Sequence, residues 1–137
     1  MRSFSLAERR ARLARRHFLV HDGSADPIAR ITRDLVGLHA TDPATPYLSL
    51  WARVPGFTVA DLDDALYQRR TLVKHLAMRR TLWVVGVDDL PLIQAAASDR
   101  VADNERRRLI ADVQKAGVAS DGDQWLDRAC DAVLTHL

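Results

Sequence analysis

His39 and Thr41 are the two residues whose types and spacing point most directly to chemistry in this sequence. Apolar residues recur at helical spacing just before them, which predicts a helix over residues 27–40 that Asp42-Pro43 ends. We expect the two side chains to point into one cleft at the end of that helix. A neutral imidazole offers a nitrogen that can accept a proton from water, and a threonine hydroxyl can bind the water.

Each of these residues also has a plain structural interpretation. His39 could bond a free carbonyl group at the end of the helix, and Thr41 could supply a turn hydroxyl. Asp42 could cap the following turn, or it could orient a water molecule. The residue types alone leave both interpretations open.

Length and composition place the chain among ordinary globular proteins. Its 137 residues suffice for one domain, or for one domain and part of another, and 47% of them are hydrophobic, enough for a core. No apolar run approaches the roughly 18 residues of a membrane span, and we identify no signal peptide. The single cysteine excludes an internal disulfide and a cysteine zinc cluster, so we expect a protein of the reducing cytoplasm.

No metal ion or other cofactor is predicted. His17 and His21 are four residues apart, with Asp22 nearby, but no third ligand is evident. The sequence also has no glycine-rich phosphate loop, no nucleophile elbow and no His-Glu-x-x-His motif.

Basic residues cluster in two places, although the net charge is only +2. Residues 1–20 hold six arginines and one glutamate, and residues 69–80 hold five basic residues and no acid. Such clusters suit phosphate contacts, because neutralising a phosphate releases counterions; arginine-rich helix faces are also common as solvated surface. The predicted phosphate contacts are Arg9, Arg12, Arg16, Arg69, Lys74, Arg79 and Arg80.

Caps, periodicity and chain breakers predict a mainly α-helical fold with one small β-hairpin. The expected helices are residues 5–20, 27–40, 47–53, 58–68, 88–114 and 121–135. Strands over residues 71–77 and 81–87 flank the Arg79-Arg80 turn of the hairpin, and the fifth helix could break near Asp103.

The order of these elements is that of a winged helix-turn-helix domain, in which helices precede a basic hairpin. One helix of such a domain enters the major groove, and the hairpin touches phosphates or the minor groove. We expect this DNA-binding domain over residues 1–87, and a helical extension over residues 88–137 that starts a second unit. The second unit looks truncated, as a fragment or a short natural form would be. Trp51 and Trp83 are expected in the core.

Residues 35–53 read Leu-Val-Gly-Leu-His-Ala-Thr-Asp-Pro-Ala-Thr-Pro-Tyr-Leu-Ser-Leu-Trp-Ala-Arg. This run resembles the start of the AlkZ/YcaQ-like family of winged-helix DNA-binding proteins, which includes glycosylases that excise alkylated bases. The family pattern reads approximately Leu-Val-Gly-Leu-Gln-Ala-Gln-Asp-Pro, followed by Ser-Pro-Tyr-Leu-Ala-Leu-Trp-Ala-Arg. The resemblance continues through residues 54–57, Asp61 and residues 72–82, and so covers most of residues 5–95.

The resemblance implies a catalytic role for His39 and Thr41, with Asp42 in support, because they stand where the family has two glutamines and the following aspartate. Alkylation puts a positive charge on the base, so the remaining tasks are to stabilise the sugar cation and to place a water molecule. Thr41 has a shorter reach than glutamine. A protonated His39 would repel the cationic base, so any activity should fall as His39 becomes protonated.

Three functions follow as hypotheses. The leading one is a winged-helix module that binds double-stranded DNA and carries an altered catalytic motif. The second is an active alkylpurine DNA glycosylase in which His39 and Thr41 replace the glutamine pair. The third is a dimerisation or assembly module that pairs with another copy or with missing C-terminal domains. The apolar stripe for that assembly would be Trp125, Leu126, Val133 and Leu134.

Overall fold

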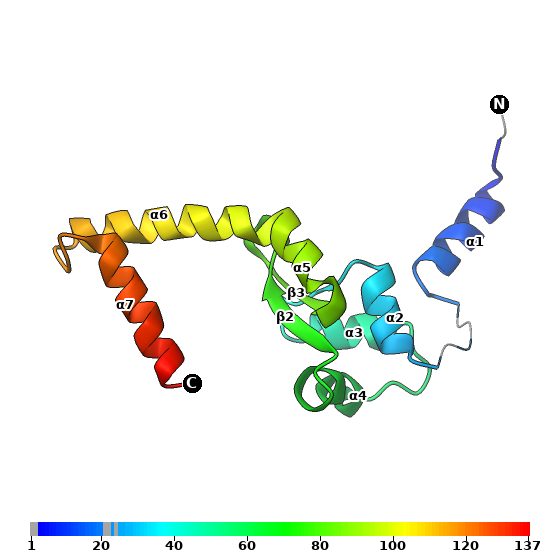
Figure 1. The fold of residues 1–137 in the computed structure, drawn as a ribbon. Coiled ribbons are helices and arrows are strands. Elements are labelled where there is room, and N and C mark those ends of the chain that lie inside the picture. The colour runs from blue at the N-terminus through cyan, green and yellow to red at the C-terminus, as the bar shows by residue number, and fades with distance from the viewer. Residues whose placement is uncertain (1–2, 21–22, 24) are drawn as a thin grey trace.

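The computed structural model of the protein describes residues 3–20, 23 and 25–137. These residues form a mainly helical molecule with one small antiparallel sheet (Figure 1). The helices are α1 (Leu6–Arg16), α2 (Pro27–Asp34), α3 (Thr45–Trp51), α4 (Val59–Asp63), α5 (Leu90–Ile93), α6 (Asp99–Lys115) and α7 (Gly122–Thr135). The strands are β1 (Leu38–His39), β2 (Leu72–Leu76) and β3 (Leu82–Gly86). Within the described residues, no helix has both the length and the apolar character needed to cross a membrane.

The sheet has the strand order β1-β3-β2, and both neighbouring pairs are antiparallel. β2 and β3 are the predicted hairpin, joined by a 3₁₀ turn at Met78–Arg80, so that prediction is confirmed. The structure adds a third strand, β1, to this hairpin. This two-residue strand lies on the other side of β3, where Leu38 is opposite Val84. β3 is therefore the central strand, and it determines where β1 lies.

The helix expected over residues 27–40 is wrong in its second half, because α2 ends at Asp34. Val36 and Gly37 then take positive φ angles of 66° and 131°, which turn the chain out of the helix and into β1. Gly37 lies against β3, since a Cβ atom there would be 3.1 Å from the carbonyl oxygen of Val84. The segment that follows is a strand and not the end of a helix.

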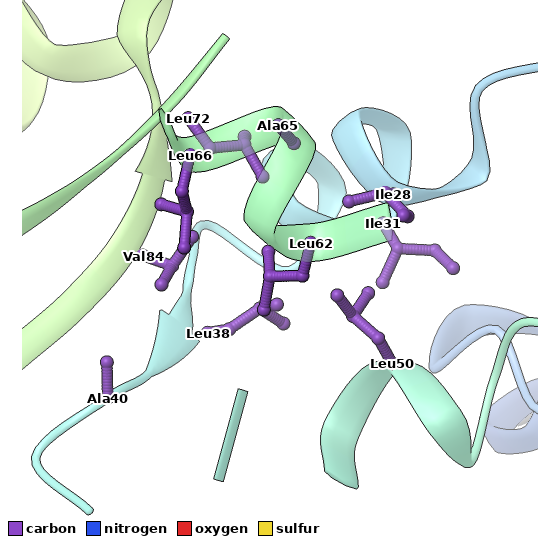
Figure 2. Close-up of a cluster of buried hydrophobic side chains, with 10 residues drawn as sticks. All are labelled: Ile28, Ile31, Leu38, Ala40, Leu50, Leu62, Ala65, Leu66, Leu72 and Val84. Carbon is purple, nitrogen blue, oxygen red and sulfur yellow. The ribbon is translucent and has the colours of Figure 1, made fainter. Parts of the chain in front are cut away.

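The main hydrophobic core fills the space between β1, β3 and the helices α2, α3 and α4 (Figure 2). Leu50 of α3, Leu62 of α4 and Val84 of β3 are fully buried there. The next residue of β3, Val85, points to the opposite face of the sheet and packs with Ile93 of α5 in a second cluster. Helices thus cover both faces of the central strand.

The predicted starts of the first two helices are confirmed. Ser5 and Glu8 form the expected capping box of α1, and the Asp26 side chain caps α2. α1 is shorter than predicted because Phe18, with a φ of 57°, cannot continue the helix. No residue of α1 is buried, and Figure 1 shows this helix standing away from the body of the molecule.

α6 and α7 form a helical hairpin that extends from the sheet (Figure 1). α6 runs through Asp103 without interruption, so the predicted break there is wrong; the irregularity is a π-helical turn over Gln94–Ser98. Arg106 of α6 donates hydrogen bonds to Asp127 and Asp123 of α7, each at 2.6 Å. These contacts tie the two helices together. They also raise the pKa of Arg106, and the hydrogen bond to Asp127 contributes most to that rise.

We predict that Gly37→Ala destabilises the protein by about 2 kcal/mol or more, because the new methyl group meets β3 while φ stays at 131°. Gly56→Ala is the matched control. Gly56 also has a positive φ, but a Cβ atom there meets nothing within 4 Å, so its loss should be about 1 kcal/mol. Urea unfolding measures both changes. Equal losses at the two positions would contradict the close approach of Gly37 to β3.

Candidate functional site

His39 and Thr41 lie at the end of β1 on its outward side, so the expected position of His39 at a helix end is wrong. Leu38 and Ala40 alternate with them and are buried in the core, whereas His39 and Thr41 are exposed. Residues two apart in a strand share a face, but in a helix they would point about 200° apart. The strand is therefore what brings the two polar side chains together.

The two side chains lie within reach of one another. Oγ1 of Thr41 is 3.3 Å from Nε2 of His39, and it accepts a hydrogen bond from the backbone N–H of Leu82 at 3.2 Å. The N–H of Leu82 uses one of the two lone pairs of that oxygen and leaves its proton available. The hydroxyl can therefore donate this proton to Nε2 of a neutral histidine. A protonated His39 would instead donate to Thr41 and would lose its acceptor nitrogen.

Trp83 and Thr81 connect this pair to the turn of the hairpin. The Trp83 ring stands edge-on to the His39 ring, with the ring centroids 5.3 Å apart. Nε1 of Trp83 donates to Oγ1 of Thr81 at 2.8 Å, and Thr81 donates in turn to the carbonyl oxygen of Met78 at 2.7 Å. One run of contacts along β3 therefore holds both the polar pair and the turn.

Arg79 and Arg80 form the tip of the hairpin. Both are exposed, and their left-handed φ angles of 57° and 59° are ones at which glycine or asparagine is usual. Arg80 also pairs with Glu105 of α6 at 3.0 Å. Leu82, which binds Thr41, follows Arg80 by only two residues. The predicted catalytic pair and the predicted arginine contacts of the hairpin thus lie at the same end of the sheet.

Two other predicted phosphate contacts are engaged by neighbouring side chains. Nζ of Lys74 donates to the hydroxyl of Tyr67 at 3.1 Å. Arg69 pairs with Asp64 and with Asp26, and the hydrogen bond to Asp64 is the main reason that the pKa of Arg69 is raised. A guanidinium that faces two carboxylates offers little net charge to a phosphate. Arg69 is therefore a weaker candidate than Arg79 or Arg80.

The three predicted contacts on α1 lie apart from the hairpin tip. Arg9, Arg12 and Arg16 follow one another at spacings of three and four residues, so they share one face of the helix. Arg12 stacks over the ring of Phe4, with its guanidinium carbon 4.2 Å from the ring centroid. Figure 1 places α1 on the far side of α2 from the sheet, so these arginines form a separate basic surface.

The remaining predicted side chains make a local contact or lie outside the described residues. Oδ1 of Asp42 accepts a hydrogen bond from the backbone N–H of Ala44 at 2.8 Å, which is the turn contact that was one of its two expected roles. His21 and Asp22, considered with His17 as a metal site, lie outside the described residues. In the part of the chain that the structure describes, no group of three or more His, Cys, Asp or Glu could hold a metal ion.

Sequence reasoning missed an apolar hollow between α3 and α4. Trp51, predicted in the core, is 71% exposed, so that prediction is wrong. Pro46 and Leu50, four residues apart, form the buried stripe of α3, and Trp51 lies off that stripe. The hollow has a volume of about 290 Å³ and is lined by Tyr47, Leu48, Trp51, Phe57 and Val59.

A second histidine contact also went unpredicted, and it is structural. Oγ of the buried Ser98 donates to the carbonyl oxygen of Leu76 at 2.8 Å and lies 2.8 Å from Nε2 of His75. Because the hydroxyl proton points at the carbonyl, Nε2 of His75 must donate to Ser98. This serine is not an activated nucleophile, and the contact ties β2 to the π-helical turn before α6.

Helices on both faces of a three-stranded sheet, with a polar pair and an arginine turn at one end, define the architecture of the protein. A comparison with protein-family models matches residues 32–137 to the family described as DNA glycosylase AlkZ-like. The match spans most of the chain, including β1 and the hairpin, so the chain belongs to the AlkZ-like DNA glycosylase family. This confirms the family indicated by residues 35–53. No curated protein and no solved structure matches the chain.

Tyr47→Phe should lower the free energy of unfolding by about 1 kcal/mol at neutral pH, because it removes the 2.7 Å hydrogen bond to Asp63. That bond raises the pKa of Tyr47 to about 12, so folding stabilises the protonated tyrosine. The contribution is fully present below the ordinary tyrosine pKa of about 10 and is lost as the pH rises toward 12. Guanidinium unfolding at about pH 7 and about pH 9 should show the same difference between the two proteins. A difference in unfolding free energy that is smaller at about pH 9 than at about pH 7 would contradict a Tyr47 pKa raised by the hydrogen bond to Asp63.

Proposed function

We propose that this protein binds duplex DNA through the tip of its hairpin and presents the His39–Thr41 pair to a base of that DNA. One observation carries the proposal: Thr41 is bonded to Leu82, which follows the Arg79-Arg80 tip by two residues. A DNA backbone held by the tip would therefore pass close to the pair. Membership of a DNA glycosylase family supports DNA as the substrate.

The order of the elements supports a winged helix as the DNA-binding unit. α2, β1, α3, α4 and the hairpin follow one another, and β1 closes the sheet beside β3. We place this unit within residues 1–87 and treat residues 88–137, which hold α5 to α7, as a helical extension.

The charge on α4 favours the hairpin as the element that contacts phosphates. A helix of a helix-turn-helix domain usually enters the major groove. Here α4 and the turn that continues it carry Asp61, Asp63 and Asp64, whose carboxylates would repel the DNA backbone. We therefore assign the phosphate contacts to Arg79 first and to Arg80 second, since Arg80 must share its charge with Glu105.

A second candidate function, excision of an alkylated base, is favoured by the close approach of His39 and Thr41. The positive charge of such a base makes it a good leaving group, so the protein needs an acceptor for the attacking water and no competing cation. Neutral His39 supplies the acceptor nitrogen, and Thr41 supplies a hydroxyl 3.3 Å away. When the Thr41 hydroxyl turns its proton away from Nε2, a water molecule on the exposed side can donate to Nε2 of His39 and accept from Thr41, and it would then be positioned for attack.

Arg79→Ala should weaken duplex binding and reduce the magnitude of the salt slope by about 1, because one phosphate contact is lost. Gel shifts on an undamaged duplex over a series of salt concentrations measure both effects. Arg108→Ala is the matched control, because it removes the same charge from an exposed position on α6. It should leave the slope unchanged. The assignment of the hairpin fails if Arg79→Ala binds as tightly as the wild type at low salt.

Base excision predicts that the wild-type chain releases N7-methylguanine from duplex DNA and that His39→Ala releases none. The reaction needs neutral His39, because a protonated imidazole has no acceptor nitrogen and repels the cationic base. Chromatography of the free base measures the rate, with duplex binding measured in parallel. Release at the wild-type rate by His39→Ala would remove His39 as the base. Binding without any release would leave DNA binding as the function.

A further inference from the structure

The apolar hollow between α3 and α4 is open to solvent. Three of its lining residues, Leu48, Trp51 and Val59, are exposed, and Trp51 is the most exposed of them at 71%. A tryptophan is rarely left at the edge of an apolar hollow unless another surface covers it, because its ring carries a large apolar area. The hollow therefore has the character of a binding surface.

One acidic side chain of α4 borders this hollow. The carboxylate of Asp63 accepts the hydroxyl proton of Tyr47, which lines the hollow. Asp61 lines the neighbouring hollow with Asp26 and Arg69, and its carboxylate caps α4 through Thr58. On the α3 side, the guanidinium of Arg53 is directed at two backbone carbonyl groups. An occupant of the hollow should accordingly be apolar with positively charged flanks.

α1 has this character. Leu6 and Leu13, seven residues apart, share one face of the helix and are 63% and 48% exposed. Arg9 and Arg10 follow Leu6 by three and four residues, so they lie beside the leucines. The C-terminal end of α1 is attached to its own chain through the hydrogen bond from Arg53, but no residue of the helix is buried. α1 is thus an arm that is anchored at one end and stands away from the body of the molecule (Figure 1), and both of its leucines are exposed.

We propose that α1 of one copy docks its leucine face into the α3–α4 hollow of a second copy, and that this exchange is reciprocal. Two identical contacts related by a twofold axis then cover both leucine faces and both hollows. The arginines of one copy meet the carboxylate of Asp63 in the other. This interaction goes beyond the proposed DNA binding and needs no DNA.

Charge distinguishes α1 from the apolar stripe of α7. On α7, Val133 and Leu134 are exposed, but Asp131 accompanies them. The carboxylate of Asp131 carries the same sign as that of Asp63, so docking of α7 into the hollow would bring like charges together. Trp125 and Leu126, the other two residues of the apolar stripe predicted on this helix, are half-buried. The exposed part of the stripe is therefore smaller than predicted.

Sedimentation equilibrium over a range of protein concentrations tests the exchange. The wild type should be dimeric, and Leu6→Ser/Leu13→Ser and Trp51→Ser should each weaken the dimer by at least about tenfold. The substituted side chains are exposed, so circular dichroism should show that both variants remain folded. Val133→Ser/Leu134→Ser is the matched control, because it removes similar apolar surface from α7, and it should leave the dimer intact.

Mixing the two defective variants separates the exchange from other arrangements. The Leu6→Ser/Leu13→Ser chain keeps an intact hollow, and the Trp51→Ser chain keeps an intact α1, so the mixture restores one of the two contacts. We expect the heterodimer to be tighter than the self-association of either variant. A wild type that is monomeric at every concentration, a mixture no tighter than its components, or a dimer lost only in the α7 variant would overturn the proposal.

Discussion

The pairing of the two-residue strand β1 with β3 is the interaction on which the rest of the structure depends. It turns Leu38 and Ala40 into the core, and the N–H of Ala40 donates to the carbonyl oxygen of Leu82 at 2.8 Å. The same pairing turns His39 and Thr41 outward. A shift of the register by one residue would bury the two polar side chains and expose Leu38, so the packing of the core fixes the geometry of the site.

Backbone strain occurs on both sides of this pairing, and only the strain at Val36 is offset by burial. Val36 has a left-handed φ, which costs on the order of 1–2 kcal/mol, and the burial of Leu38 two residues later offsets that cost. Arg79 and Arg80 have similar φ angles at the hairpin tip, but they are exposed and gain no such burial. Arginines that occupy a turn where glycine would fit with less strain suit a surface whose side chains act in binding.

Local sequence signals predicted the elements that local interactions form. The capping box of α1, the Asp26 cap of α2 and the hairpin all follow from residues close together in the chain. β1 could not be predicted in this way, because a two-residue strand has no periodicity of its own, and the apolar run from α2 continues into it. The resemblance to the family identified His39 and Thr41 as a pair, but their placement depends on Leu82, which lies 41 residues after Thr41.

The central claim is that the polar pair and the arginine tip form one DNA-contacting surface. A nuclear magnetic resonance titration of isotope-labelled protein with a short duplex tests it most directly. We expect the amide signals of residues 38–42 and 78–82 to shift together and to saturate at the same duplex concentration, while those of α7 stay in place. Shifts confined to α1, with the signals of β1 and the hairpin unmoved, would contradict the account.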